Sequence, residues 1–437
     1  TGLRFSLHRA KKYVVIESTG KTPRVLIVAE HASAKFGGEA ILPLHYFRVL
    51  RKRGVEAWLI VHSRTREELS RLFASDLDRI HFLPDTKYHR LLYHLGKPLP
   101  GQLRHFSVGF LSRLSSQRHA KRLARRLIAE HRIDVVHQPI PVSPKESSLL
   151  HGLGAPVVIG PMNGGMSFPP GFTTSQGPVT SAFMRAGRLF SGFVNHLMPG
   201  KLRAQMLLVA NDRTRRALPK AVRGRVITLV ENGVDLSLWT AAERNGRKPG
   251  PTRFAFTGRL VDWKAVDVLL EAFARVAKQT DASLDIMGDG PMRAQLQSQS
   301  KSLALDAKVT FHGWVAQSDC AARLRGADAL VLPSLYECGG AVVLEAMAMG
   351  LPVIATDWGG PADYLDAACG ILVPPKSREQ FVSDLAAAML TLANSPELRT
   401  EMGRAGRRRV EEIFDWESKV DRILEIYGQT INGTAPS

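Results

Sequence analysis

One segment decides the fold of this 437-residue chain: Glu337-Cys338-Gly339-Gly340-Ala341-Val342-Val343-Leu344-Glu345. The apolar run 329–334 before it predicts a strand, and the run 342–349 after it predicts a helix that a Gly-Leu-Pro sequence ends. Glu337 therefore falls in a strand-to-helix turn, and Glu345 falls about a turn and a half inside the helix. The glycine pair offers backbone N–H groups at a helix N-terminus, where an anion is favoured. The segment suits a ligand with hydroxyl groups on both sides of a phosphate, such as a nucleotide-sugar.

The composition is that of a soluble globular protein, with 44% hydrophobic and 23% charged residues. No run of 18 or more apolar residues occurs, so no transmembrane helix is expected. The basic segment 1–20 holds an apolar piece too short for a secretory signal. The three cysteines, Cys320, Cys338 and Cys369, are widely spaced and odd in number. They predict free thiols in a reducing compartment, and hence a cytoplasmic protein.

The charge differs between the two halves of the chain. Residues 1–230 hold 37 Lys and Arg against 13 Asp and Glu, a net charge of +24. Residues 231–437 hold 22 against 27, a net charge of −5. This split predicts that the first half faces an anionic partner, such as a membrane surface, a phosphorylated substrate or a nucleic acid. A solvated basic surface without a partner is the alternative.

Both halves alternate apolar strands with helices, which predicts an α/β protein with two doubly wound, Rossmann-like domains. Their ligands are expected at the carboxyl ends of parallel strands. The Asn-Gly turn in 230–235 marks the hinge between domains 1–230 and 231–413, where the charge changes sign. The predicted strands are 24–29, 57–61, 134–137, 156–160, 206–210, 225–230, 253–257, 283–287, 308–311, 329–332, 352–355 and 370–373. The predicted helices are 40–53, 104–131, 265–279, 291–303, 318–324 and 378–393.

Four segments resemble the retaining glycosyltransferases of family 4, which have the GT-B fold. The resemblance covers most of the chain and is strongest over 225–427. It implies two Rossmann-like domains facing across a cleft, an acceptor-side domain 1–230, a nucleotide-sugar domain 231–413 and a tail 414–437 that packs back on the first domain. The four segments are Glu231-Asn232-Gly233-Val234-Asp235, Phe256-Thr257-Gly258-Arg259-Leu260 followed by Lys264, Gly288-Asp289-Gly290-Pro291, and the segment from Glu337 to Glu345.

The resemblance assigns donor-binding roles in the second domain. Arg259 and Lys264 follow a strand end, where a guanidinium fork and an ammonium group can neutralise a diphosphate. By resemblance, Glu337 binds the transferred sugar and Glu345 the ribose hydroxyls. Backbone N–H groups and the base contact are expected at Gly258, Trp314, Val315, Gly339, Gly340, Ala341 and Val342. As alternatives, the two basic residues would be ordinary surface cations and the two glutamates solvated carboxylates. The Trp314 ring would then serve only in packing.

The first domain departs from the family pattern. Gly37 and Gly38 resemble the glycine loop that closes over the donor, although a plain structural turn is the alternative. A His-x-His motif is common after the fourth strand, but here Pro139 replaces the second histidine. His137 keeps the first position, with a catalytic or a structural role. Asn163 lies in the next loop and is predicted to contact the sugar or the acceptor.

The predicted reaction needs no metal and no cofactor. The Asp76-Leu77-Asp78 triplet matches an Asp-x-Asp metal pattern, but it precedes an apolar strand in the wrong domain. The resemblance implies that Arg259, Lys264 and helix N-termini replace the divalent cation. The protein is expected to be a retaining hexosyltransferase that uses a nucleotide diphosphate-sugar as its donor. A UDP-sugar is the favoured donor, and a GDP-sugar is the alternative.

The acceptor is expected at the basic first domain. The stretch 104–131 predicts a basic amphipathic helix, which lies either on an anionic membrane or with its apolar face toward the core. We therefore expect a saccharide or lipid-linked acceptor and a role in bacterial surface polysaccharide synthesis. The protein would then act on the inner face of the cytoplasmic membrane. A nucleic-acid-binding protein would fit the charge, but no aromatic-basic interleaving occurs. A GT-B epimerase or phosphorylase, and a nicotinamide oxidoreductase, are the other enzyme classes left open.

Overall fold

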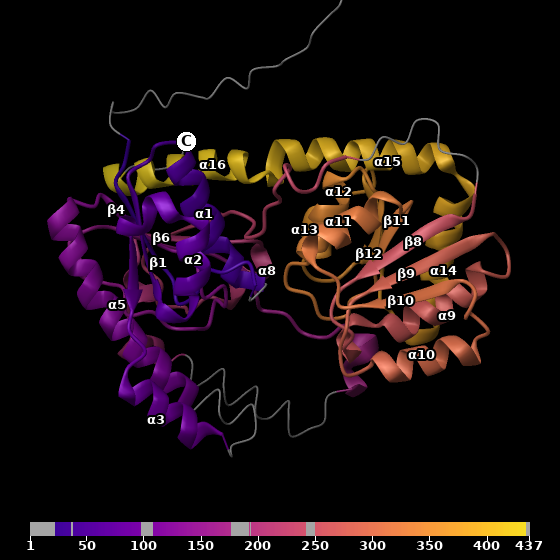
Figure 1. Cartoon of the computed structure of the whole chain (residues 1–437), viewed down its shortest axis with the longest axis horizontal. Coiled ribbons are helices and arrows are strands. Elements are labelled where there is room, and N and C mark those ends of the chain that lie inside the picture. Colours follow the sequence, from indigo (N-terminus) through magenta and orange to yellow (C-terminus); the bar gives the residue numbers. More distant parts are fainter. Residues whose placement is uncertain are drawn as a thin grey trace, which may run out of the picture.

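The computed structural model describes residues 22–35, 38–97, 108–175, 192, 194–241 and 250–433. Its strands form two parallel sheets, one in each of two lobes that lie side by side (Figure 1). Elements in indigo and magenta build the first lobe, and elements in orange build most of the second. The predicted α/β class with two parallel sheets is therefore confirmed.

The sheet of the first lobe has seven strands in the order β3-β2-β1-β4-β5-β6-β7. Alternate residues of β1 face different cores: Val25 and Ile27 pack on one side, and Leu26 and Val28 on the other. Helices must therefore cover both faces. The strands are β1 (Val25–Val28), β2 (Ala57–His62), β3 (Ile80–Leu83), β4 (Val135–Gln138), β5 (Val157–Met162), β6 (Met206–Val209) and β7 (Arg225–Thr228).

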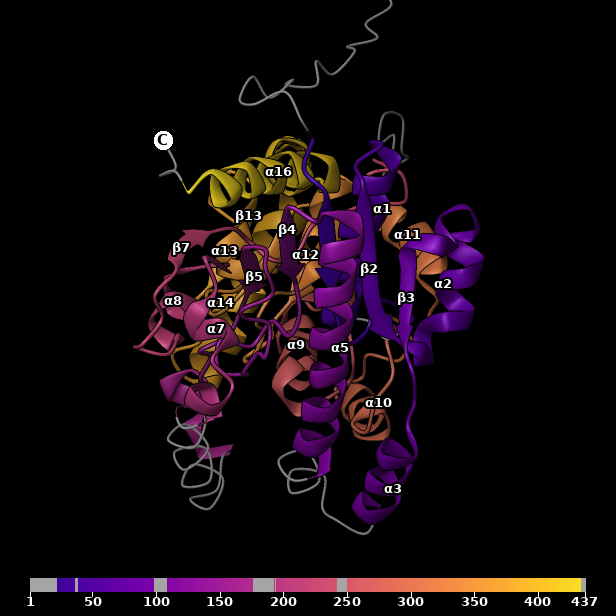
Figure 2. The same cartoon turned by 90° about the vertical axis from the view of Figure 1, so that its left-hand side faces the viewer.

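The helices of the first lobe divide between those two cores. Tyr46 and Phe47 of α1 pack in the core on one face, while Ala124 and Leu127 of α5 pack in the core on the other. Figure 2 shows α5 standing in front of the sheet. The helices are α1 (Ile41–Lys52), α2 (Arg66–Leu72), α3 (Lys87–Gly96), α5 (Phe110–His131), α7 (Gly200–Arg203) and α8 (Asp212–Ala217).

The second lobe is built on a six-stranded sheet in the order β10-β9-β8-β11-β12-β13. Helices α9 and α10 lie on one side of it, and α11 and α12 on the other (Figure 1). The strands are β8 (Thr252–Thr257), β9 (Ala282–Met287), β10 (Val309–Gly313), β11 (Ala329–Leu332), β12 (Val353–Thr356) and β13 (Gly370–Val373). The helices are α9 (Val266–Val276), α10 (Arg293–Ser302), α11 (Gln317–Arg325), α12 (Ala341–Ala348), α13 (Pro361–Tyr364) and α14 (Arg378–Asn394).

Two C-terminal helices run along one edge of both lobes. Helix α15 (Pro396–Arg409) lies over the second lobe, and α16 (Trp416–Asn432) returns to the first (Figure 1). Trp416 is 2% exposed and packs against the rings of His45 and Tyr46 in α1. The core on one face of the first sheet is therefore completed by the last helix of the chain.

The structure differs from the predicted elements in a few places. The helices that were not predicted are α2, α3, α7, α8, α13 and α15. Helix α5 is described over Phe110–His131, and the predicted start near residue 104 falls outside the described ranges. The buried residues of α5, among them Ala120 and Leu127, face the first sheet. This agrees with the predicted alternative in which the apolar face of the helix packs on the core. None of the helices in the described ranges is long and apolar enough to cross a bilayer.

Replacing Trp416 by Ala should lower the free energy of unfolding by about 3–5 kcal/mol, because a large buried side chain leaves a cavity between α16 and α1. Urea denaturation followed by far-UV circular dichroism measures the change. Trp314→Ala is the matched control, since that indole is 78% exposed. Equal unfolding midpoints for the two variants would show that α16 does not stabilise the first lobe.

Candidate functional site

The double-glutamate segment joins the carboxyl end of β11 to the N-terminus of α12. Gly340 precedes the helix with φ +82°, a left-handed conformation that favours glycine. A Cβ on Gly340 would lie 3.1 Å from Cγ of Glu337, so a larger residue would press on that side chain. The first N–H groups of α12 have no partner within the helix and can bind an anion.

Lys264 and Glu337 form an ion pair beside this helix N-terminus. Lys264 ends a short 3₁₀ turn after β8, and its Nζ donates a hydrogen bond to Glu337 Oε2. Both side chains are mostly shielded, at 15% and 16% exposure. The residues predicted to hold the diphosphate and the sugar are thus in direct contact, and a cation and an anion stand together at the end of the sheet.

A pocket of about 460 Å³ lies beside the pair, at the carboxyl ends of β8, β9 and β10. Gly258 and Gly288 bring two strand-end turns together, because a Cβ on Gly288 would overlap the Gly258 carbonyl. The pocket brings four predicted donor residues to one place. Its lining is Thr257, Gly258, Arg259, Met287, Gly288, Asp289, Trp314 and Val315. Asp289 also lines the pocket. It lies in one of the four segments that resemble the family, but no role was predicted for it.

Glu345 lies half-buried on the first turns of α12. Desolvation raises the pKa of its carboxyl to about 7, and a hydrogen bond with Gln317 opposes the rise. Gln317 begins α11 only two residues after Val315, so Glu345 is tied to the segment that lines the pocket. Sequence reasoning missed Gln317, and its place directly after a predicted base-contacting segment was the available signal.

Asn163 is buried in a network that joins the two lobes. Its Nδ2 donates to Glu231 Oε1 at 2.9 Å and to the Cys338 carbonyl at 2.6 Å. The side chain is 3% exposed. The amide nitrogen of Asn163 therefore holds the double-glutamate segment from across the interface, and the predicted contact with the sugar or the acceptor stays a prediction. The same network explains Gly339, where a Cβ would overlap the side chains of Asn232 and Glu231.

A buried lysine supports this network from the tail helix. Lys419 of α16 is 3% exposed and donates to the carbonyls of Val230 and Asn232. Burial lowers the pKa of Lys419 to about 7, and the charge of Glu231 opposes the shift. Burial likewise raises the pKa of Glu231. The signal for Lys419 was a lysine between Trp416 and Val420 on the apolar face of a helix.

His137 lies in the core of the first lobe and has no exposed surface. It is fully buried, and burial lowers its pKa to about 4, so the ring is neutral. Its Nε2 donates to the Gly160 carbonyl at 2.6 Å, and its Nδ1 accepts from the Tyr427 hydroxyl at 2.7 Å. Nε2 thus holds β4 to β5 and Nδ1 holds the sheet to α16, which supports the structural role rather than the catalytic one.

Only half of the predicted glycine loop can be placed. Gly37 lies outside the described residues. Gly38 opens a 3₁₀ turn with φ +51°, and a Cβ there would meet nothing within 4 Å. The next residue, Glu39, accepts a hydrogen bond from the Val142 backbone N–H at 2.9 Å. The turn is therefore held to the loop that follows β4.

In the described part of the chain, the side chains of His62, Asp85 and His89 approach closely enough to share a metal ion. The Nδ1 atoms of both histidines accept backbone N–H groups, at 3.3 Å for His62 and 3.2 Å for His89. These hydrogen bonds occupy the lone pair of each Nδ1 atom and so compete with the coordination of a metal ion. Asp76 of the Asp-x-Asp triplet is paired with Arg51 at 2.7 Å. These residues do not form a fitting metal site.

Comparisons with known proteins agree with this geometry. Residues 239–409 match the family model described as Glycosyl transferases group 1. Glycogen synthase of Mycobacterium tuberculosis (strain H37Rv) is 31% identical over 203 residues, which cover 46% of this chain and 48% of that protein. D-inositol 3-phosphate glycosyltransferase of Rhodococcus erythropolis is 33% identical over 230 residues, covering 48% and 51%. The chain spans about half the length of the curated relatives it matches.

A likeness to a solved structure extends over nearly the whole chain. The Anabaena protein HepE in complex with UDP superimposes with a TM-score of 0.61 at 14% identity, covering 93% of this chain and 100% of that chain. At this identity the likeness concerns the fold. Two Rossmann-like sheets that face each other define the GT-B architecture, and the predicted fold is confirmed.

Replacing Glu345 by Gln should stabilise the protein increasingly as the pH rises. The raised pKa means that the folded wild type is most stable below about pH 4.5 and loses stability as pH rises through about 7, where the buried carboxyl must ionise. The variant lacks this loss, so its advantage should grow by about 1–2 kcal/mol between pH 5 and pH 8. Glu412→Gln, at an exposed carboxylate, is the control. Parallel stability curves for the wild type and Glu345→Gln would contradict the shift.

Proposed function

We propose that this protein is a glycosyltransferase that moves a sugar from a nucleotide diphosphate-sugar to a saccharide or lipid-linked acceptor. The observation that carries the proposal is the Lys264–Glu337 ion pair, which lies at the N-terminus of α12 beside the Arg259 pocket. The cations and the helix N–H groups match the negative charges of the diphosphate, and the carboxylate can accept hydrogen bonds from sugar hydroxyl groups. The group 1 family match over 239–409 supports it.

Each donor group has a partner in the second lobe. Arg259 and Lys264 would neutralise the diphosphate, and the N–H groups of 339–342 would bind its oxygens. Glu337 would accept hydrogen bonds from the transferred sugar, and Glu345 from the ribose. The base would lie against Trp314 and Val315. The UDP held by the HepE structure favours a UDP-sugar, with a GDP-sugar as the alternative.

The proposed reaction retains the anomeric configuration and belongs to the family 4 type. As the diphosphate leaves, charge develops on its terminal oxygen, where Arg259 and Lys264 stabilise it without a metal ion. The acceptor hydroxyl attacks the same face of the sugar and passes its proton to the leaving phosphate oxygen. Closure of the lobes about 230–235 would exclude water, so that the acceptor rather than water takes the sugar.

The acceptor would bind to the first lobe. Its net charge of +24 over 1–230 favours an acceptor that carries phosphate, such as a lipid-linked saccharide. We place this step in bacterial surface polysaccharide synthesis, on the cytoplasmic side, with peripheral association at an anionic membrane. The named activities of the relatives, on glycogen and on inositol phosphate, support a saccharide or polyol acceptor in general.

The double variant Arg259→Ala/Lys264→Ala should reduce donor turnover by at least 100-fold, about 3 kcal/mol of transition-state stabilisation. Release of nucleoside diphosphate from a panel of nucleotide-sugars, with calorimetric donor binding, measures the effect. Arg275→Ala/Lys278→Ala removes two exposed cations from the same lobe and should retain wild-type rates. Wild-type activity in the first variant would refute the assignment of the donor site.

Retention of configuration can be tested before the acceptor is known. Slow hydrolysis of the donor by the enzyme, followed by proton NMR, should release sugar that first appears in the same anomeric form as in the donor. The physical reason is that attack occurs on the face from which the diphosphate departs. Initial appearance of the opposite anomer would exclude the retaining reaction while leaving glycosyl transfer itself intact.

A further inference from the structure

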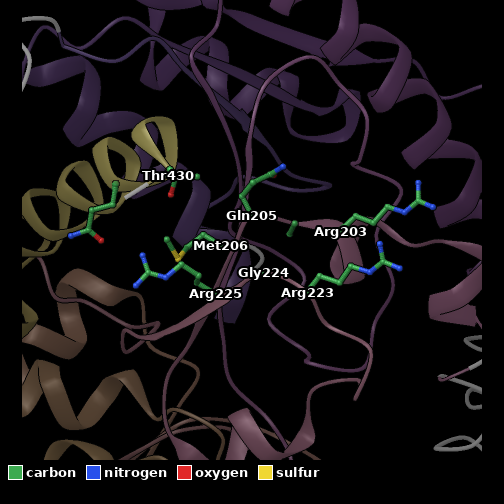
Figure 3. Close-up of a pocket in the computed structure, with 10 residues that line it drawn as sticks. Arg203, Gln205, Met206, Arg223, Gly224, Arg225 and Thr430 are labelled. Atoms are coloured by element: carbon green, nitrogen blue, oxygen red, sulfur yellow. The ribbon is translucent and has the colours of Figure 1, made fainter. Parts of the chain in front are cut away.

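A second pocket, of about 350 Å³, lies between the first lobe and helix α16. It lies where β6 and β7 begin, whereas Asn163 follows the carboxyl end of β5 and contacts the second lobe. Because the strands are parallel, the pocket and the Asn163 contact with the second lobe lie at opposite ends of the strands. The lining is Arg203, Ala204, Gln205, Met206, Arg223, Gly224, Arg225, Gln429, Thr430 and Gly433 (Figure 3).

Two backbone segments hold the arginines of this pocket in place. The Arg223 N–H donates to the Leu202 carbonyl at 3.1 Å, and the Arg225 N–H donates to the Gln205 carbonyl at 3.0 Å. Gly224 allows this close approach, since a Cβ there would overlap the Ala204 carbonyl. The segments before β6 and β7 are therefore in register, and the arginines project from a well-supported backbone.

Arg203 and Arg223 are charged groups without a counter-ion. Within the described ranges, neither guanidinium has a hydrogen-bond or ion-pair partner. Figure 3 shows both side chains extending toward the same side of the pocket, while Arg225 extends toward the other. Two unpaired guanidinium groups on neighbouring segments repel each other, and an anion between them would remove that repulsion.

More cations surround Arg203 from other elements. Lys121 and Arg125 project from α5, and His151 lies in the loop before β5. Desolvation lowers the pKa of Lys121, and the charges of Arg125 and Arg203 lower it further. Desolvation also lowers the pKa of His151, followed by the charges of Lys121, Arg203 and Arg125. The charges that act on both groups are thus all positive.

Gln429 of α16 contributes to the wall of the pocket. The Oε1 atom of Gln429 is buried and has no hydrogen-bond partner in the described structure. The two ends of a glutamine amide are assigned by their partners, so a half-turn of the amide would present Nε2 as a donor instead. The pocket then offers an N–H donor in addition to its guanidinium groups.

We propose that this pocket binds a phosphate group of an anionic ligand, at a site separate from the nucleotide-sugar site. Arg203 and Arg223 supply paired N–H donors that match phosphate oxygens, and Gln429 supplies a neutral donor. The volume suits a small head group rather than an extended chain. The phosphate can belong to a soluble phosphate ester or to a lipid head group, and the shared chemistry is the same.

The test uses the full chain carrying Arg259→Ala/Lys264→Ala, so that the donor pocket does not capture the probe. Calorimetry with inorganic pyrophosphate forms one arm, and co-sedimentation with phosphatidylglycerol-containing vesicles, compared with phosphatidylcholine alone, forms the other. Both run at about 0.15 M ionic strength, where loose surface attraction is screened. In this background, adding Arg203→Ala/Arg223→Ala should weaken binding at least 10-fold, and adding Arg275→Ala/Lys278→Ala should change it less than twofold.

The outcomes separate the sources of the phosphate. Loss of pyrophosphate binding in the pocket variant supports a soluble ligand, and loss of vesicle binding alone supports a lipid head group. Arg203→Lys/Arg223→Lys keeps the charge without the fork, so it should bind with intermediate affinity and serves if the alanine variant unfolds. Failure of both probes to bind the parent protein, or equal binding by the pocket and control variants, would overturn the proposal.

Discussion

The contact of Asn163 with the Cys338 carbonyl is the interaction on which the arrangement of the site depends. One buried amide from the first lobe holds the turn that carries Glu337, and it also binds Glu231 at the junction of the lobes. Buried polar groups are costly when unpaired, so this network favours one relative position of the two sheets. Helix α16 supports it from outside through Lys419. The turn that carries Glu337 is thereby held against the first lobe.

The ion pair of Lys264 and Glu337 suits the protein both without a ligand and with a bound nucleotide-sugar. Each side chain is largely removed from water, and each neutralises the other. A bound diphosphate and sugar would offer Lys264 an anion and Glu337 hydroxyl donors, so the pair can exchange partners without leaving a buried charge unpaired. The backbone N–H groups at the start of α12 lie beside the pair.

Local sequence patterns predicted the sheets well. The strands are short apolar runs such as β11, which is buried along its whole length, and such runs are typical of parallel sheets covered on both faces. The missed helix α15 shows the limit of this reasoning. Its sequence is strongly polar, and its buried residues are only Met402, Gly403 and Gly406, so it lacks the apolar stripe that marks an amphipathic helix. Its position depends on close backbone contact instead: a Cβ on Gly403 would overlap the Gly350 carbonyl.

The sequence by itself determined the alternation of elements, the turn between Glu337 and Glu345, and the pocket residues around Arg259, because each lies within a few positions of a strand end. The tertiary structure alone decided the roles of His137 and Asn163. His137 meets Tyr427 at a sequence separation of 290, and Asn163 meets Cys338 at a separation of 175. A side chain becomes structural when distant residues satisfy all its polar atoms. That is decided by how α16 and the two sheets pack, which no local pattern records.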